Sequence, residues 1–337
     1  MNILIFGASG FIGQDFLNRF SEKFGNVYVF SRINDLVYDC PQVKPVLFAD
    51  LESLTDISCV LHFAFDHSYR ENIKLAECVY SICNLNECPL IYLSSFVVRD
   101  LLSGLSLKGT ESRLNDPYTL EKARVKRHLE LLFDSSKVNM LQIEPGIVFG
   151  MRGGWFDHVR DVFRHSFIFL SNSGKNITAF IYVGELSSYI YEKSIEGNFT
   201  NGSVLIASDL IKSWSDFYCL YGRLMGHKIS IKNLDSRRLH PHYIVHILMS
   251  IIIFTKVGKV LFKFTPTIKY YFKKLARVRR ESENYNVREK TDGYRSYGVT
   301  CVLQTSDLEK NMSSSFNDFT KTNMFTERQI LEEMKND

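Results

Sequence analysis

A tyrosine and a lysine stand four residues apart in the stretch NDPYTLEK, at Tyr118 and Lys122. Four residues make about one helical turn, so on a helix the two side chains project together. A phenol has an unperturbed pKa of about 10, too high for an efficient proton shuttle at neutral pH, and a nearby ammonium group lowers that pKa by favouring the phenolate. Such a pair can protonate a carbonyl oxygen or deprotonate an alcohol. The alternative is a solvated helix face, on which both residue types are common.

The run GASGFIG follows an apolar run of strand length and opens a segment with helical spacing. Glycine lets the backbone turn tightly and approach a pyrophosphate, and a helix start offers free N–H groups and the positive end of its dipole. The pattern therefore predicts a dinucleotide site. The alternative is a tight strand–helix turn without a ligand. The residues expected to bind the cofactor in this turn are Gly7, Ser9, Gly10, Phe11, Ile12 and Gly13.

The second apolar run ends in Ser31-Arg32, without an acidic residue. An Asp at such a strand end would accept bonds from the ribose hydroxyls of NAD, whereas an Arg accommodates the extra phosphate of NADP. Arg32 can bind a phosphate through two N–H groups, and Ser31 can donate a further bond. We therefore expect NADP(H) to be the cofactor, with NAD as the alternative if Arg32 is only a surface charge.

Strand-like and helix-like segments alternate through the amino-terminal half of the chain. This alternation predicts an α/β fold, a Rossmann-type doubly wound parallel sheet with helices on both faces. Ligands of such sheets bind beyond the carboxyl ends of the strands. The expected strands are Asn2–Phe6, Val27–Ser31, Val46–Phe48, Cys59–Phe65, Leu90–Ser94 and Met140–Ile143, and the expected helices are Phe11–Phe24, Asn72–Leu85 and Pro117–Phe133.

The glycine spacing G-x-x-G-x-x-G, followed by Tyr-x-x-x-Lys after the fifth strand, resembles the extended short-chain dehydrogenase/reductase family of the NAD-dependent epimerase/dehydratase type. The resemblance extends to about Glu185 and fades beyond it. Family members carry a catalytic hydroxyl in the pattern S-x-x-V-Y-G, and the matching stretch here starts at Ser95 rather than Ser94. The resemblance implies that Ser95 orients a carbonyl, that Tyr118 is the general acid/base, and that Lys122 lowers its pKa and reaches the nicotinamide ribose.

Further segments match the family residue by residue. Asp50 and Leu51 match the position after the third strand that contacts the adenine, and Phe63, Ala64 and Phe65 match the segment that lies along the cofactor. The stretch QIEPGIVFG resembles the segment R-P-x-x-V-Y-G, whose backbone meets the nicotinamide. Its usual Arg is Glu144 here, and the usual Asp of a later segment is Glu185. The aligned nicotinamide positions are Pro145, Ile147 and Val148.

The resemblance also implies a smaller, mostly helical substrate lobe. We expect the Rossmann domain in residues 1–185, the lobe in 151–180 and 198–300, and a tail in 301–337. From Ser236 to Arg280 the chain has no Asp or Glu, and basic and apolar residues alternate at helical spacing. Its apolar core is shorter than the ~20 residues of a membrane span. Residues 240–280 therefore suit either a peripheral contact with an anionic membrane surface or an ordinary helical lobe.

The net charge of +4 gives no reason to expect a nucleic-acid partner. The seven cysteines form no C-x-x-C pair, which fits a reduced compartment, and the chain start lacks the pattern of a secretion signal. We therefore expect a cytoplasmic protein, alternatively one held peripherally at the inner face of the membrane.

The histidines show no metal-ligand spacing, so no metal is expected. Relatives typically form a homodimer, which is the expected assembly.

Three functions remain open. The first is an NADP(H)-dependent ketoreductase that acts on a nucleotide- or lipid-linked sugar in glycan biosynthesis, which Arg32 favours. The second is a nucleotide-sugar 4-epimerase with tightly bound NAD, and the third is an NADP(H)-binding sensor without turnover. A dehydratase is less favoured, because Phe96-Val97 stand where those relatives place an Asp-Glu pair. The intact set of Ser95, Tyr118 and Lys122 argues against a sensor.

Overall fold

The structure is a computed structural model that describes residues 1–30, 40–66, 68–98, 117–150, 167–175, 179–208, 213–224, 228–233 and 301–303. The chain divides into two compact units. The first comprises residues 1–156, 179–211 and 294–337, and the second comprises residues 157–178 and 212–293. Ser31 and Arg32, the stretch 99–116, and the basic stretch 236–280 lie outside the described residues.

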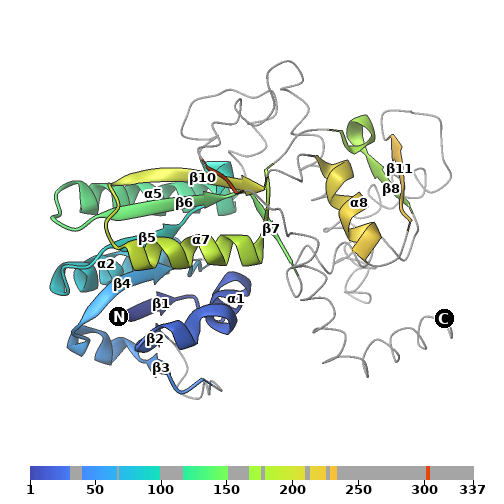
Figure 1. Ribbon diagram of the computed structural model, residues 1–337. Coiled ribbons are helices and arrows are strands. Elements are labelled where there is room, and N and C mark those ends of the chain that lie inside the picture. The colour runs from blue at the N-terminus through green and yellow to red at the C-terminus, as the bar shows by residue number, and fades with distance from the viewer. Residues whose placement is uncertain are drawn as a thin grey trace, which may run out of the picture. The chain divides into compact units, whose positions relative to one another are not determined.

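The first unit is built on one eight-stranded sheet with the order β12-β10-β6-β5-β4-β1-β2-β3 (Figure 1). All of its pairings are parallel. The predicted Rossmann-type doubly wound fold is therefore confirmed. The strands are β1 (Asn2–Phe6), β2 (Asn26–Phe30), β3 (Val43–Val46), β4 (Ile57–His62), β5 (Leu90–Leu93), β6 (Met140–Pro145), β10 (Gly202–Ser208) and β12 (Cys301–Leu303).

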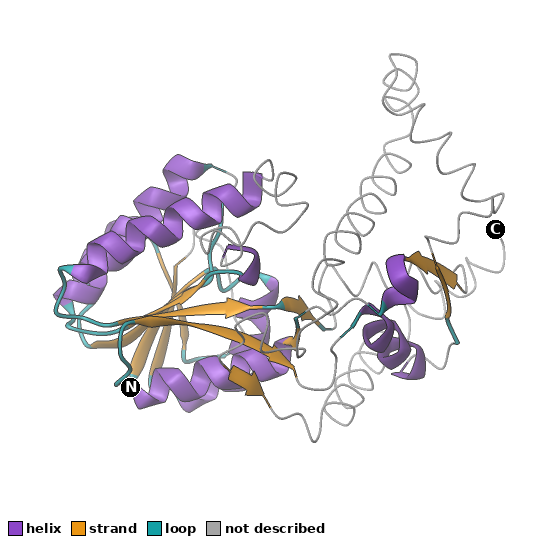
Figure 2. Cartoon of the chain, turned by 90° about the horizontal axis from the view of Figure 1, so that it is seen from above, coloured by secondary structure: helices purple, strands orange, loops and turns teal. Residues whose placement is uncertain are grey.

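Helices cover both faces of this sheet (Figure 2). Helices α1 (Phe11–Phe20) and α7 (Val183–Glu196) pack on one face, and α2 (Tyr69–Leu85) and α5 (Pro117–Asp134) pack on the other. Side chains alternate along each strand, so Ile3 and Ile5 join the first core while Leu4 and Phe6 join the second. Strands that are buried on both faces must be apolar throughout, which is why the central strands are apolar runs.

Local sequence signals set the helix ends. Ser68 caps α2 by accepting a hydrogen bond from the backbone N–H of Glu71. Helix α5 starts at Pro117, whose fixed φ suits the first helical position. Helix α7 ends at Gly197, which adopts a left-handed conformation with φ +60. Three short 3₁₀ segments complete the described helices: η1 (Ser21–Lys23), η2 (Phe48–Ser53) and η3 (Ser171–Gly174).

The third strand differs from the prediction. It was expected at Val46–Phe48, whereas β3 spans Val43–Val46 and pairs with β2 in the register Val27↔Val43. Pro45 cannot donate a ladder hydrogen bond, but it is tolerated because β3 is an edge strand. Only the two ends of β3 are buried, so its apolar signal is weak. The chain turns into η2 at Phe48, which is 61% exposed.

Two strands of the main sheet come from segments that were assigned elsewhere. Strand β10 lies within the range 198–300 that was expected to form the lobe, and β12 lies within the range 301–337 that was expected to be a tail. The first unit also holds a small parallel sheet of β7 (Ile147–Phe149) and β9 (Phe180–Tyr182). Its strand β7 follows β6 after Gly146.

The second unit contains a parallel pair of strands and one described α-helix. Strand β8 (Phe167–Leu170) pairs with β11 (Ser230–Asn233), and α8 (Trp214–Leu224) packs by η3. The buried face of α8 is aromatic, with Trp214, Phe217, Tyr218 and Tyr221 all at most 1% exposed. Within the described ranges, no helix has both the length and the apolar content needed to cross a bilayer.

Candidate active site

The glycine turn between β1 and α1 depends on the absence of side chains. Gly7 has φ +89, and the backbone N–H of Gly10 donates to the Gly7 carbonyl at 3.1 Å. A Cβ on Gly7 would lie 2.5 Å from the backbone nitrogen of Ala64, and one on Gly13 would lie 2.4 Å from the Gly7 oxygen. These contacts are shorter than real Cβ atoms tolerate, so the close approach of β1, β4 and α1 requires glycine at both positions.

The amino terminus of α1 fits an anionic group. Gly10 is its N-cap and supplies no capping side chain, and the first turn has no acidic residue. The backbone N–H groups and the positive end of the helix dipole are therefore available to a diphosphate. Phe11 and Ile12 are half-buried in this turn, and Ser9 is exposed and accepts a hydrogen bond from Gln14 through its carbonyl. The predicted turn residues thus form one cradle that suits a dinucleotide.

Tyr118 and Lys122 lie on the first turns of α5 with contrasting exposure. The Tyr118 side chain is 42% exposed, whereas Lys122 is 4% exposed. The Lys122 Nζ donates to the Leu93 carbonyl at 2.9 Å. It also lies 4.9 Å from the ring centroid of Phe65 and 5.4 Å from that of Tyr92. The lysine therefore sits among backbone and rings of β5 and of the segment after β4, while the phenol is open to solvent.

Burial lowers the pKa of Lys122 to about 7. Within the described part of the chain no carboxylate pairs with this amine, so desolvation of its charge is not offset. Burial, with the charge of Lys122 adding to it, lowers the pKa of His62 to about 3. His62 is thus neutral over the range in which Lys122 titrates and exerts no charge on it. The charged form of Lys122 is the one that supports a phenolate.

The two serines after β5 differ in accessibility. Ser94 is 4% exposed, and its backbone N–H donates to Ile143 of β6 at 2.8 Å. Ser95 is half-buried and starts a turn in which its carbonyl accepts from Val98. Ser95 is therefore the more accessible hydroxyl. Ser95 stands two residues after Leu93, whose carbonyl accepts the hydrogen bond from Lys122, so both residues lie at the carboxyl end of β5.

The other predicted cofactor residues that the structure describes lie at or just after the carboxyl ends of β4 and β6, or in β7 directly after β6, with one exception. Phe63, Ala64 and Phe65 follow β4, and the ring of Phe65 lies 4.9 Å from the Tyr118 ring at 73°. Pro145 ends β6, and Ile147 and Val148 lie in β7. The exception is η2, where Asp50 is exposed but Leu51 is buried in the core.

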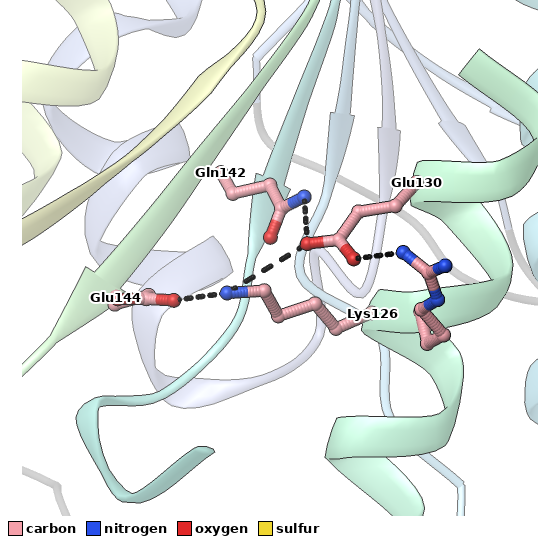
Figure 3. Close-up of polar contacts among 5 residues, drawn as sticks. Lys126, Glu130, Gln142 and Glu144 are labelled. Atoms are coloured by element: carbon pink, nitrogen blue, oxygen red, sulfur yellow. Dashed lines mark hydrogen bonds and ion pairs between the residues drawn. The ribbon is translucent and has the colours of Figure 1, made fainter. Parts of the chain in front are cut away.

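A buried ion pair lies one turn farther along α5 (Figure 3). The Lys126 Nζ is 2.6 Å from Oε1 of Glu144, which is fully buried in β6. Glu130 joins the cluster, 3.9 Å from Lys126, and accepts a hydrogen bond from Gln142. Sequence reasoning noted that Glu144 replaces an Arg but missed its partner. No local signal pairs the two residues, because Lys126 lies on α5 and Glu144 on β6, and they meet only when the helix packs on the strand.

No model of a protein family matches the chain, and no curated protein matches it in sequence. Solved structures do match. The UDP-N-acetylglucosamine 4-epimerase of Bacillus cereus shares 15% identity at a TM-score of 0.55, over 69% of this chain and 85% of that chain. That of Methanobrevibacter ruminantium M1, in complex with UDP-N-acetylmuramic acid, shares 19% at 0.54, over 70% and 86%. The human epimerase family protein SDR39U1, with NADPH, shares 15% at 0.51, over 69% and 83%.

These similarities show the fold. The chain shares the Rossmann-type fold of these solved structures, so the fold class predicted from the motifs is confirmed. The matched structures include proteins with NAD and a protein with NADPH. The glycine turn described above suits the diphosphate, which NAD and NADPH have in common.

Proposed function

We propose that this chain is an extended short-chain dehydrogenase/reductase that uses NADP(H) to reduce a keto group on a nucleotide- or lipid-linked sugar. The observation that carries the proposal is the pair of Tyr118 and Lys122 on α5, beside β5 and the segment after β4, in a fold whose glycine turn suits a dinucleotide. A solvated helix face does not explain the pair, since Lys122 is 4% exposed.

The proposed roles follow from exposure and charge. Tyr118 is open to solvent and so can meet a substrate oxygen, to which it gives a proton during reduction. Lys122, in its charged form, favours the phenolate that remains. Ser95 donates a hydrogen bond to the same oxygen and orients it. A bound nicotinamide cofactor would supply the hydride, with its diphosphate held by the glycine turn.

The choice of NADP(H) rests on sequence alone, through Ser31 and Arg32, which lie outside the described residues. The substitution Arg32→Asp should reverse the preference for NADPH over NADH, because an acidic side chain repels the extra phosphate of NADPH and accepts hydrogen bonds from the ribose hydroxyls of NADH. Binding constants for NADPH and NADH, measured on both proteins, check this expectation. Equal constants for the unchanged chain would contradict it.

A nucleotide-sugar 4-epimerase is the second candidate. Several of the matched structures favour it, because they are UDP-N-acetylglucosamine and UDP-glucuronic acid 4-epimerases. An epimerase would use the same three residues and return the hydride to the other face of the sugar. Its cofactor would then stay bound and show no net change.

One experiment separates the two candidates. The purified protein is stripped of bound cofactor and incubated with 4-keto and 4-hydroxy nucleotide sugars in the presence of NADPH or NAD. Net loss of NADPH absorbance with a reduced product supports the reductase. Interconversion of 4-hydroxy isomers without net change in cofactor supports the epimerase. Absence of both reactions with the full panel would contradict the nucleotide-sugar substrate class.

A further inference from the structure

We propose that Phe65 is a positioning residue for the Tyr118–Lys122 pair: its ring separates the Lys122 side chain from solvent and packs against the Tyr118 ring. The inference rests on the proposed function, which gives the pair its role in proton transfer. It goes beyond the resemblance, which placed Phe65 only in a segment that lies along the cofactor.

The ring of Phe65 contacts both members of the pair. Its centroid is 4.9 Å from the Tyr118 ring centroid, with the planes at 73°, an edge-to-face arrangement. The Lys122 Nζ is also 4.9 Å from this centroid, within the range of a cation–π contact. Phe65 therefore connects the two side chains through one ring.

The two rings near Lys122 differ in exposure. One of them belongs to Tyr92, which is 1% exposed and packs against the sheet core. Phe65 is half-buried, so one part of its ring meets solvent while another part covers the amine. Of the two rings, Phe65 is thus the one whose removal should open the buried Lys122 to water.

A turn with a buried asparagine fixes Phe65 in place. The next residue, Asp66, donates its backbone N–H to Oδ1 of Asn72 at 2.7 Å and accepts from Nδ2 of Asn72 at 2.8 Å. Its carboxylate accepts the backbone N–H of Ser68, the N-cap of α2. Asn72 is 3% exposed on α2, so this double hydrogen bond anchors the segment after β4 to the helix.

The packing of Phe65 over Lys122 affects the pKa of the lysine. Within the described part of the chain, the rings of Phe65 and Tyr92 and the backbone carbonyl of Leu93 contact the Lys122 amine, and His62 of β4 lies close enough for the charge of Lys122 to lower its pKa. Tyr118 and Lys126 lie one turn away on the same helix. Burial alone lowers the pKa of Lys122 to about 7. Removal of the Phe65 ring admits water, which favours the ammonium form, so the proton should dissociate at higher pH.

The test is a titration of Lys122 by NMR in the full chain without cofactor. Protein labelled with ¹³C at lysine Cε is titrated, and Lys122→Met identifies the resonance. We expect Phe65→Ala to raise the midpoint of Lys122 by one pH unit or more, about a tenfold change in its dissociation constant. Phe20→Ala is the matched control: Phe20 is also half-buried and stacks on Tyr191 at 4.4 Å, on the opposite face of the sheet. It should leave the midpoint unchanged.

An unchanged midpoint in folded Phe65→Ala would overturn the proposal. If that variant does not fold, the unchanged chain still decides the question. A midpoint near 7 and nuclear Overhauser contacts between the Phe65 ring and the Lys122 Cε protons support the proposal, whereas an ordinary lysine midpoint or the absence of those contacts overturns it. Because the titration needs no substrate, its outcome is independent of whether the chain turns over a sugar.

Discussion

At the scale of single residues, the buried lysine has a measurable effect on stability. Burial lowers the pKa of Lys122 in the folded chain to about 7 from the 10.5 of an ordinary lysine. Between pH 7 and 10.5 the unfolded chain binds more protons at Lys122 than the folded chain does, so the free energy of unfolding rises with pH across this window. Below pH 7 the folded chain carries the full cost of burying the charged amine. We expect Lys122→Met to be most stabilising, relative to the unchanged chain, below pH 7.

This advantage of Lys122→Met should shrink as pH rises toward 10, by an amount on the order of 4 kcal/mol over the window. Urea unfolding of both proteins at a series of pH values measures the difference. A difference that stays constant with pH would show that Lys122 is solvated in the folded chain.

The buried pair of Lys126 and Glu144 gives a second residue-scale prediction. Glu144→Gln removes the close partner of the buried Lys126 charge and leaves only Glu130, 3.9 Å away, so we expect it to cost about 3–5 kcal/mol of unfolding free energy. The matched control is Glu196→Gln, because the Lys193–Glu196 pair has the same 2.6 Å separation but lies at the surface, with side chains 27% and 52% exposed. This change should cost at most about 1 kcal/mol. Equal costs in chemical denaturation would contradict the role of burial.

The sequence predicted these residues unevenly. Tyr118 and Lys122 were found because their spacing is local. The burial of Lys122 could not be predicted, because it depends on Phe65 and Tyr92, which come from two other elements. The partner of Glu144 was missed for the same reason, since Lys126 and Glu144 are joined only when α5 packs on β6.

At the scale of elements, the glycine turn is the most sensitive point. Gly13→Ala places a methyl group 2.4 Å from the Gly7 oxygen, so the turn must shift. We expect at least a tenfold loss of NADPH affinity and a lower unfolding free energy, by about 1–3 kcal/mol. Gly202→Ala is the control, because the nearest atom to its added Cβ is 4.0 Å away. Binding titrations on both variants check this, and equal affinities would contradict the cradle.

Elements buried on both faces were predicted well and the sheet edge was not. Strands β1 and β5 are largely apolar runs that end at Gly7 and Ser94, and four of the six residues of β4 are apolar, which is a strong local signal. Strand β3 has two exposed residues between two buried ones and includes Pro45, so its position depends on pairing with β2. The place of β10 beside β6 likewise follows from tertiary packing and not from local pattern.

At the scale of the whole molecule, cofactor binding should stabilise the chain. A ligand that binds only the folded state at a hundredfold its dissociation constant adds about 2.7 kcal/mol. NADPH should therefore raise the unfolding temperature, and NADH at the same concentration should raise it less. Hydrogen exchange should show the protection around residues 7–13 and 63–66 of the first unit. Protection confined to the second unit would contradict the assignment of the cofactor site.

The most direct test of the central claim is a pair of measurements on Tyr118→Phe. This change removes one hydroxyl from an exposed ring and leaves the contact of that ring with Phe65 intact. The proposal predicts that NADPH binds within about threefold of its original affinity, while turnover of the identified sugar substrate falls by 10²–10⁴-fold, the range of general acid–base catalysis. Turnover close to that of the unchanged chain would show that Tyr118 is not the proton donor.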